Sequence, residues 1–109
     1  PTHGAALVET VLKDAVLRAL WVDELAAMRY RIKEMRQALV AGLEAEGVTD
    51  FGFIAEQVGM FSYSGLTKDQ MIKLREEHHV YGTDAGRICV AALNAGNVEY
   101  VSKAIAAVL

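Results

Sequence analysis

The sequence feature that most constrains the fold is a long segment of helical periodicity over residues 14–46. Apolar residues recur along it at alternating steps of three and four, which places them on one face of a single helix. They are Leu17, Trp21, Leu25, Met28, Ile32, Met35, Leu39 and Leu43. The opposite, polar face carries Arg18, Asp23, Arg29, Arg31, Lys33, Glu34 and Arg36. Such a helix would be about 50 Å long, more than the span of a small domain. We therefore expect it to bridge two domains or to pack against something outside this chain.

The segments on either side of this helix predict an α/β fold in which helices pack on a short sheet. Residues 4–12 predict a short helix, Asp14 is expected to cap the long helix, and Gly47 is expected to end it. Then come a helical turn at 53–56, a strand at 60–64, a helix from the capping box at 67–70 to His78, a short strand at 80–81, a turn at 82–86 and a β-type run at 87–92. Asn94 is expected to cap a last helix whose core face carries Val98, Val101, Ile105 and Val108.

Composition allows one domain-sized core and argues against several kinds of partner. The chain has 109 residues, 53% of them apolar and 23% charged, and a net charge of −3. Charges of both signs are interspersed without a basic stripe, so we expect no nucleic-acid partner. No apolar run approaches the roughly 20 residues of a membrane span, so we expect no membrane partner. The single cysteine, Cys89, excludes an internal disulfide, fits a cytoplasmic protein and is expected to be a small buried side chain.

Arg87 is the most informative polar residue. It follows Gly86 and opens an uncharged run, residues 88–93. A guanidinium in that setting needs an anion or several carbonyls as partners, and its planar fork suits a carboxylate held by two parallel hydrogen bonds. The alternative is a structural ion pair with Asp84 or another acid, and the residues taken alone favour it. Phe61 and Tyr63 share one strand face, so Phe61 either walls a pocket or packs in the core, and spacing alone favours the core.

Other side chains give no catalytic pattern. The adjacent His78 and His79 do not have the spacing of a metal-ligand pair on a helix, and no metal site is expected. No glycine-rich phosphate loop and no nucleophile elbow occur. The lysines all fall at helix ends or on polar helix faces, away from the apolar setting that imine chemistry needs. They are Lys13, Lys33, Lys68, Lys73 and Lys103.

Four segments, read in order, carry a family resemblance. They are PTHGAALVETVL at 1–12, LWVDELAAMRYRIKEMRQ at 20–37, GMFSYSGLTKDQMIKLREEHHVY at 59–81 and AGRICVAALN at 85–94. Together they resemble the carboxyl-terminal part of class I (fold type I) pyridoxal-phosphate aminotransferases of the aspartate and aromatic amino acid kind. The match covers essentially the whole chain. The pairing of FSYSGL with RICVAALN looks more like the aromatic members than the aspartate ones.

The resemblance implies roles and partners. Arg87 matches the arginine that grips the α-carboxylate of the substrate, and Phe61 matches an aromatic residue that lines the active site. The parent enzyme would use pyridoxal phosphate to move an amino group from an amino acid to a 2-oxo acid, commonly 2-oxoglutarate, and would act as a homodimer. Residues 1–13 would end a large-domain segment, residues 14–46 would form the interdomain helix, and residues 47–109 would form a small carboxyl-terminal α/β domain.

The family's other functional groups lie upstream of this segment, and these departures limit what the chain can do alone. The imine-forming lysine, the pyridine-binding aspartate, the phosphate-binding groups and the second, side-chain-reading arginine have no match here. We therefore expect no catalytic or cofactor-binding residue in this chain, no pyridoxal phosphate bound by it alone, and no activity from it alone. Two alternatives remain: an interaction module that self-associates through the long helix, and a carboxylate-binding module that uses Arg87.

Overall fold

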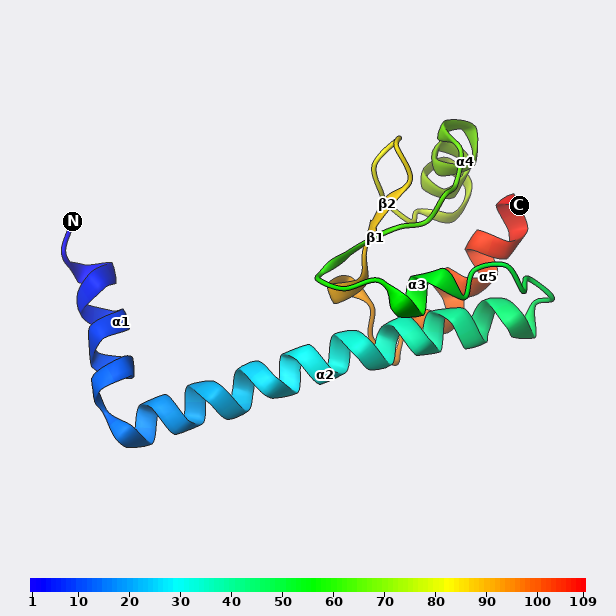
Figure 1. Ribbon diagram of the computed structural model, residues 1–109. Helices are drawn as coiled ribbons and strands as arrows, with labels where there is room; N and C mark the ends of the chain where they lie inside the picture. The colour runs from blue at the N-terminus through cyan, green and yellow to red at the C-terminus, as the bar shows by residue number, and fades with distance from the viewer. The chain divides into compact units, whose positions relative to one another are not determined.

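The computed structural model describes all residues, Pro1–Leu109, and by its internal contacts the chain divides into two compact units. The first unit is residues 1–31 and the second is residues 32–109. The long helix α2 (Ala15–Ala45) contributes residues to both (Figure 1). The predicted α/β class is confirmed, because the second unit combines helices with a two-stranded sheet.

The first unit contains helix α1 (His3–Lys13) and the beginning of α2. Asp14 separates the two helices: its N–H donates to the Thr10 carbonyl at 3.1 Å, and its carboxylate accepts from the N–H groups of Val16 and Leu17, both at 2.9 Å. The predicted cap is therefore confirmed. The apolar side chains of this unit find no core within it, and α1 buries none of its residues.

The second unit begins with the carboxyl-terminal half of α2. Leu39 and Leu43 are fully buried there. The helix ends at Ala45, just before the predicted stop at Gly47, whose φ of +85° lets the Val48 N–H turn back to the Leu43 carbonyl at 2.9 Å. One expectation for this helix is wrong: Arg36, assigned to the polar face, is only 2% exposed. Its burial follows from packing against β1, because its guanidinium donates to backbone carbonyls of that segment.

The sheet consists of β1 (Phe61–Tyr63) and β2 (Arg87–Cys89), paired antiparallel. The strand expected at residues 80–81 is absent, because the Val80 N–H is used to close helix α4, donating to the Leu74 carbonyl at 3.0 Å. The β-type run expected at 87–92 stops at Cys89 and continues as the 3-10 helix η1 (Val90–Ala92). The run turns there because the N–H groups of Val90 and Ala91 both donate to the Met60 carbonyl, at 2.9 and 3.2 Å.

Three further helices complete the second unit. The turn α3 (Phe53–Glu56) and the helix α4 (Lys68–His78) occur where they were predicted, and α4 carries the expected capping box between Thr67 and Gln70. The last helix, α5 (Val98–Val108), begins later than expected. Asn94 does not cap it, because the Asn94 side-chain oxygen accepts from the Gly96 N–H within a preceding turn.

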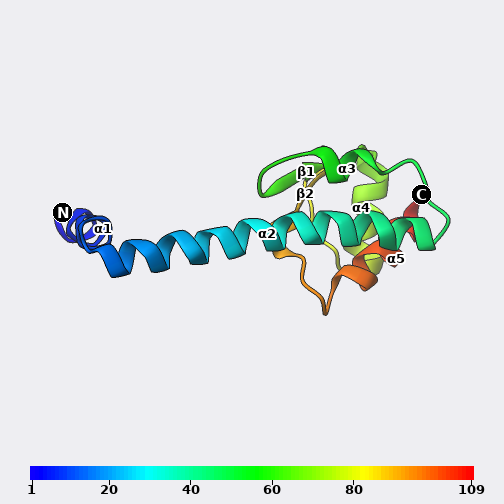
Figure 2. The same ribbon diagram turned by 60° about the horizontal axis from the view of Figure 1, so that its bottom comes forward.

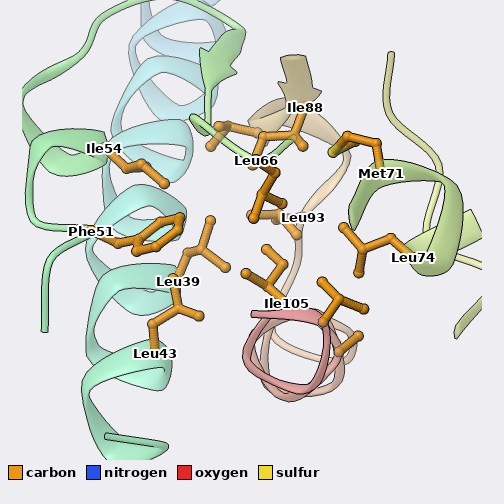
Figure 3. Close-up of a cluster of buried hydrophobic side chains, with 13 residues drawn as sticks. Leu39, Leu43, Phe51, Ile54, Leu66, Met71, Leu74, Ile88, Leu93 and Ile105 are labelled. Atoms are coloured by element: carbon orange, nitrogen blue, oxygen red, sulfur yellow. The ribbon is translucent and has the colours of Figure 1, made fainter. Parts of the chain in front are cut away.

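The core of the second unit lies between α2, α4, α5 and the buried face of the sheet. Figure 3 shows Leu39, Leu66, Leu93 and Ile105 pointing toward one another. Each fully buried leucine or isoleucine contributes about 1.5–3 kcal/mol relative to an exposed position. On α5, Ile105 and Val108 are buried while Val98 and Val101 are half-buried, as the predicted face requires. None of the helices combines the length and the apolar character that a membrane span requires.

Helix α5 lies against the carboxyl-terminal half of α2 (Figure 2), and Gly42 faces Ser102 there. A Cβ placed on Gly42 would lie 2.3 Å from Ser102 Oγ and 2.8 Å from Ser102 Cβ. Ser102 is 1% exposed, and its hydroxyl donates to the Val98 carbonyl at 2.8 Å. The absence of a side chain at position 42 therefore sets the spacing of the two helices.

We predict that Gly42→Ala lowers the stability of the second unit, although alanine favours a helix by about 1 kcal/mol over glycine. The clash with Ser102 should cost about 1–3 kcal/mol, as overpacking does. The measurement is the midpoint of thermal unfolding. Ala41→Gly, at the exposed neighbouring position, is the control and reports the difference in helix propensity between alanine and glycine alone. In the double variant Gly42→Ala/Ser102→Gly the coupling should be favourable; strictly additive effects would contradict a direct clash.

Candidate carboxylate-binding site

The pairing of β1 with β2 brings Arg87 and Phe61 together. In its register Phe61 lies opposite Cys89 and Tyr63 lies opposite Arg87. Because side chains alternate along a strand, these four residues share one face of the sheet. The Arg87 guanidinium carbon lies 5.3 Å from the centroid of the Phe61 ring, in the range of a cation–π contact.

A hollow of about 250 Å³ opens on this face of the sheet, lined by Phe61, Tyr81, Gly82, Thr83, Arg87 and Cys89. Phe61 and Tyr81 give it aromatic walls, and Arg87 is the one charged residue that lines it. Cys89 is half-buried in this wall rather than fully buried as expected. The hollow can therefore admit a small anion with an apolar body.

Arg87 has no acidic partner in the chain. The alternative interpretation, a structural ion pair between Arg87 and Asp84, is wrong, because Asp84 pairs with Arg75 at 3.2 Å. Further ion pairs join Lys13 with Glu9 and Lys103 with Glu99. Arg87 is exposed, so its guanidinium keeps donors for a ligand that enters the hollow.

A tight turn aims Arg87 into the hollow. The Thr83 N–H donates to the Arg87 carbonyl at 2.9 Å, and the Arg87 N–H donates to Thr83 Oγ1 at 3.1 Å. Gly86 closes the turn with φ +88°, a conformation that suits glycine. Its carbonyl accepts from both the N–H and the hydroxyl of buried Ser64, at 2.8 and 2.7 Å. The residue before Arg87 is thus fixed to the strand that carries Phe61.

Sequence reasoning missed Arg36, which lies at the outer edge of β1. Its Nη1 donates to the Ile54 carbonyl at 3.2 Å and to Ser62 Oγ, and its Nη2 donates to the carbonyls of Gly59 and Phe61 at 2.6 and 2.9 Å. Burial lowers the pKa of Arg36, but a guanidinium stays protonated in proteins.

A signal for the burial of Arg36 was present in the sequence. Arg36, Leu39 and Leu43 follow the i, i+3, i+7 spacing of one helix face. The charge of Arg36 concealed this pattern, because charged residues are almost never fully buried unless they are paired.

The residues present do not fit the imine-forming part of a pyridoxal-phosphate site. All five lysines are exposed, and none lines the hollow beside Arg87. Lys103 illustrates the mismatch: its hydrogen bond to Glu99 raises its pKa, which keeps the amine protonated and non-nucleophilic. No group of three His, Cys, Asp or Glu side chains is placed to hold a metal ion. At the end of α4, the backbone carbonyl of His78 accepts from the Tyr100 hydroxyl at 2.8 Å.

The family model described as aminotransferase class I and II matches residues 1–105. The chain therefore belongs to the class I and II aminotransferases. Among its relatives, the aspartate aminotransferase of Pseudomonas aeruginosa is 54% identical over 110 residues, and the aromatic-amino-acid aminotransferase of Escherichia coli K12 is 48% identical. Each of these alignments covers 100% of this chain and 28% of the relative, so the chain spans a little over a quarter of their length.

Solved structures give the same result. The aromatic-amino-acid aminotransferase of Burkholderia pseudomallei, covalently bound to pyridoxal phosphate, matches with a TM-score of 0.97 at 57% identity, over 100% of this chain and 28% of that one. A mitochondrial aspartate aminotransferase of Trypanosoma brucei matches with a TM-score of 0.95 at 50% identity, over 99% of this chain and 29% of that one. Both the aspartate and the aromatic types are thus similar to this chain.

We predict that Gly86→Ala lowers the unfolding midpoint more than Gly65→Ala does. Both glycines have positive φ, +88° and +75°, so each substitution should carry a strain cost of about 1–2 kcal/mol. Only at Gly86 would the new Cβ also meet backbone, 2.8 Å from the Leu66 carbonyl oxygen. The difference between the two variants in unfolding midpoint isolates this clash, and equal losses would show that the close approach is unimportant.

Proposed function

We propose that this chain is the carboxyl-terminal part of a longer pyridoxal-phosphate aminotransferase, and that Arg87 binds the α-carboxylate of its substrate. The preferred donor in this proposal is an aromatic amino acid, with aspartate as the alternative, and the acceptor is a 2-oxo acid such as 2-oxoglutarate. The observation that supports it best is an arginine without an acidic partner, at the edge of a hollow walled by Phe61, in a chain of this family.

The chemistry of Arg87 suits this role. A guanidinium can donate two parallel hydrogen bonds to a carboxylate, and such charge-assisted pairs are about twice as strong as neutral ones. The Phe61 ring, whose centroid lies 5.3 Å from the guanidinium carbon, offers a cation–π contact on one side of the guanidinium. A carboxylate held at two points cannot rotate freely, so the α-carbon and its amine take a defined orientation. Positioning of this kind lowers the barrier of the reaction that follows.

The remainder of the catalytic machinery lies outside this chain in our proposal. Pyridoxal phosphate supplies an electron sink when it is bound, and the exposed position of every lysine here supports an upstream origin for the imine-forming group. The isolated chain is then inactive and binds no cofactor.

The division of the chain is part of the same proposal. Residues 1–13 end the large domain, 14–46 form the interdomain helix and 47–109 form the small domain. Large apolar side chains exposed in the first unit, such as Val16 at 77% and Met28 at 58%, support the presence of further protein that covers them, from the same chain or from a dimer partner.

We predict that Arg87→Ala in the full-length protein lowers kcat/KM for phenylalanine by about 10²-fold or more, because charge-assisted hydrogen bonds contribute about 1.5–3 kcal/mol each. Arg87→Lys should lose less, since it keeps the charge but not the fork. Turnover of phenethylamine, which lacks the carboxylate, should not change. The measurement is single-turnover amino transfer, and Lys73→Ala, at an exposed position of α4, is the control.

Three outcomes separate the possibilities. An equal loss for phenylalanine and phenethylamine would mean that Arg87 does not contact the carboxylate. Full-length protein that transfers no amino group yet binds 3-phenylpropionate through Arg87 would favour the non-catalytic carboxylate-binding module. If the full-length protein neither transfers an amino group nor binds 3-phenylpropionate, both proposals are overturned, and the protein is a family member without this chemistry.

A further inference from the structure

Arg36 is a buried cation with only neutral partners. Its four hydrogen bonds reach three backbone carbonyls and one hydroxyl, and no carboxylate pairs with it. We infer that Arg36 is a positioning residue: it fixes the backbone of β1 and, through it, the Phe61 ring that lies against Arg87. The structural part of this inference stands on the geometry, and its link to substrate rests on the proposed function.

The peptide groups of β1 explain why such a residue is needed. The backbone groups of Met60 and Ser64 point toward β2. The Met60 carbonyl accepts from the Val90 N–H, and the Ser64 N–H donates to the Gly86 carbonyl. In an antiparallel pair, successive residues alternate between the two edges. The peptide groups of Phe61 and Tyr63 therefore point away from β2, toward the open edge of a sheet only two strands wide.

Two side chains take the place of a third strand at this open edge. Gln57 brackets Tyr63, accepting from its N–H at 3.1 Å and donating to its carbonyl at 3.0 Å. Nη2 of Arg36 donates to the Phe61 carbonyl at 2.9 Å and to the Gly59 carbonyl at 2.6 Å. A two-stranded ribbon is marginal alone, so these bonds determine where β1 lies.

Arginine is suited to this task because its rigid fork can reach acceptors from separate parts of the chain. Nη2 of Arg36 donates to the carbonyl of Gly59, just before β1, and to that of Phe61 within the strand. Nη1 donates to the carbonyl of Ile54 in α3 and to the hydroxyl of Ser62 in β1. A lysine has a single nitrogen and cannot span these four acceptors. Burying a charge without a counter-charge is costly, and here only the hydrogen bonds offset that cost.

The consequence for the site passes through Phe61. Its carbonyl is held by Arg36, and its ring lies 5.3 Å from the Arg87 guanidinium carbon on the exposed sheet face. Loosening the carbonyl lets the strand edge and the ring shift together. Arg87 then loses the surface that limits its motion, and a carboxylate in the hollow is gripped less tightly.

The test measures the dissociation constants of 3-phenylpropionate and of the neutral 3-phenylpropanamide for the full-length protein. Arg36→Lys should weaken 3-phenylpropionate binding about tenfold, since misplacement of a positioned group by about 1 Å can cost up to about 10²-fold. The neutral amide shares the apolar contact with Phe61 but not the charge-assisted bond to Arg87, so its binding should weaken less. Lys33→Met, one turn away on the exposed side of α2, is the control and should change neither constant.

A double-mutant cycle distinguishes positioning from a general loss of stability. If Arg36 acts through Phe61, then Arg36→Lys should have little further effect on binding once Phe61→Leu has removed the ring. Additive losses would overturn the route through Phe61. Unchanged affinity in Arg36→Lys, with only a lower unfolding midpoint, would reduce Arg36 to a structural role. Should Arg36→Lys fail to fold, Ser62→Ala removes one of the four acceptors and carries the same cycle, with an expected loss of about twofold.

Hydrogen exchange makes the inference testable apart from the proposed function. Amides of residues 59–63 should exchange faster in Arg36→Lys than in wild type, while those of 71–78 in α4 stay unchanged. If wild type does not bind 3-phenylpropionate through Arg87, the proposed function fails, and the exchange of β1 still decides whether Arg36 fixes that strand. Unchanged exchange at 59–63 would overturn the inference.

Discussion

The pairing of two three-residue strands is the constraint on which the rest of the second unit depends. Residues 61–63 and 87–89 are far apart in sequence, and each strand is too short to persist alone. Their pairing buries Ser62 and Ile88 on one face and gathers Phe61 and Arg87 on the other. The buried face completes a core with α2, α4 and α5, and the exposed face forms the candidate site. One register thus fixes both the packing and the chemistry.

The two arginines beside this sheet show how environment divides the uses of one residue type. Arg36 is buried and satisfies its donors within the chain, so it serves the backbone. Arg87 is exposed, and the acid nearest to it in sequence is engaged by Arg75. Hydrogen bonds to carbonyls offset the cost of burying the Arg36 charge, whereas Arg87 keeps donors for a ligand. Arg87 can therefore bind substrate in the proposed function, and Arg36 fixes β1, the strand that carries Phe61 beside Arg87.

The first unit has the opposite character, because it lacks a core of its own. Its helices expose Leu20, Trp21 and Leu25 by about half of their surface, and none of the residues in α1 is buried. Apolar stripes of this size mark surfaces that other protein covers. A chain that spans 28% of its relatives' length is expected to have such surfaces. The amphipathic pattern of α2 is therefore satisfied within the chain only over its second half.

The sequence by itself determined the elements whose signals are local. The caps at Asp14 and Thr67 and the stop at Gly47 depend on residues within one or two turns, and each is present as predicted. The family followed from the specific segments around Phe61 and Arg87. Tertiary structure decided what depends on distant partners. It ended β2 where Met60 accepts from Val90 and Ala91, it used Val80 to close α4, and it gave Asp84 to Arg75. It also buried Arg36, because carbonyls of residues 54–61 met its fork, and no pattern within α2 records where those carbonyls lie.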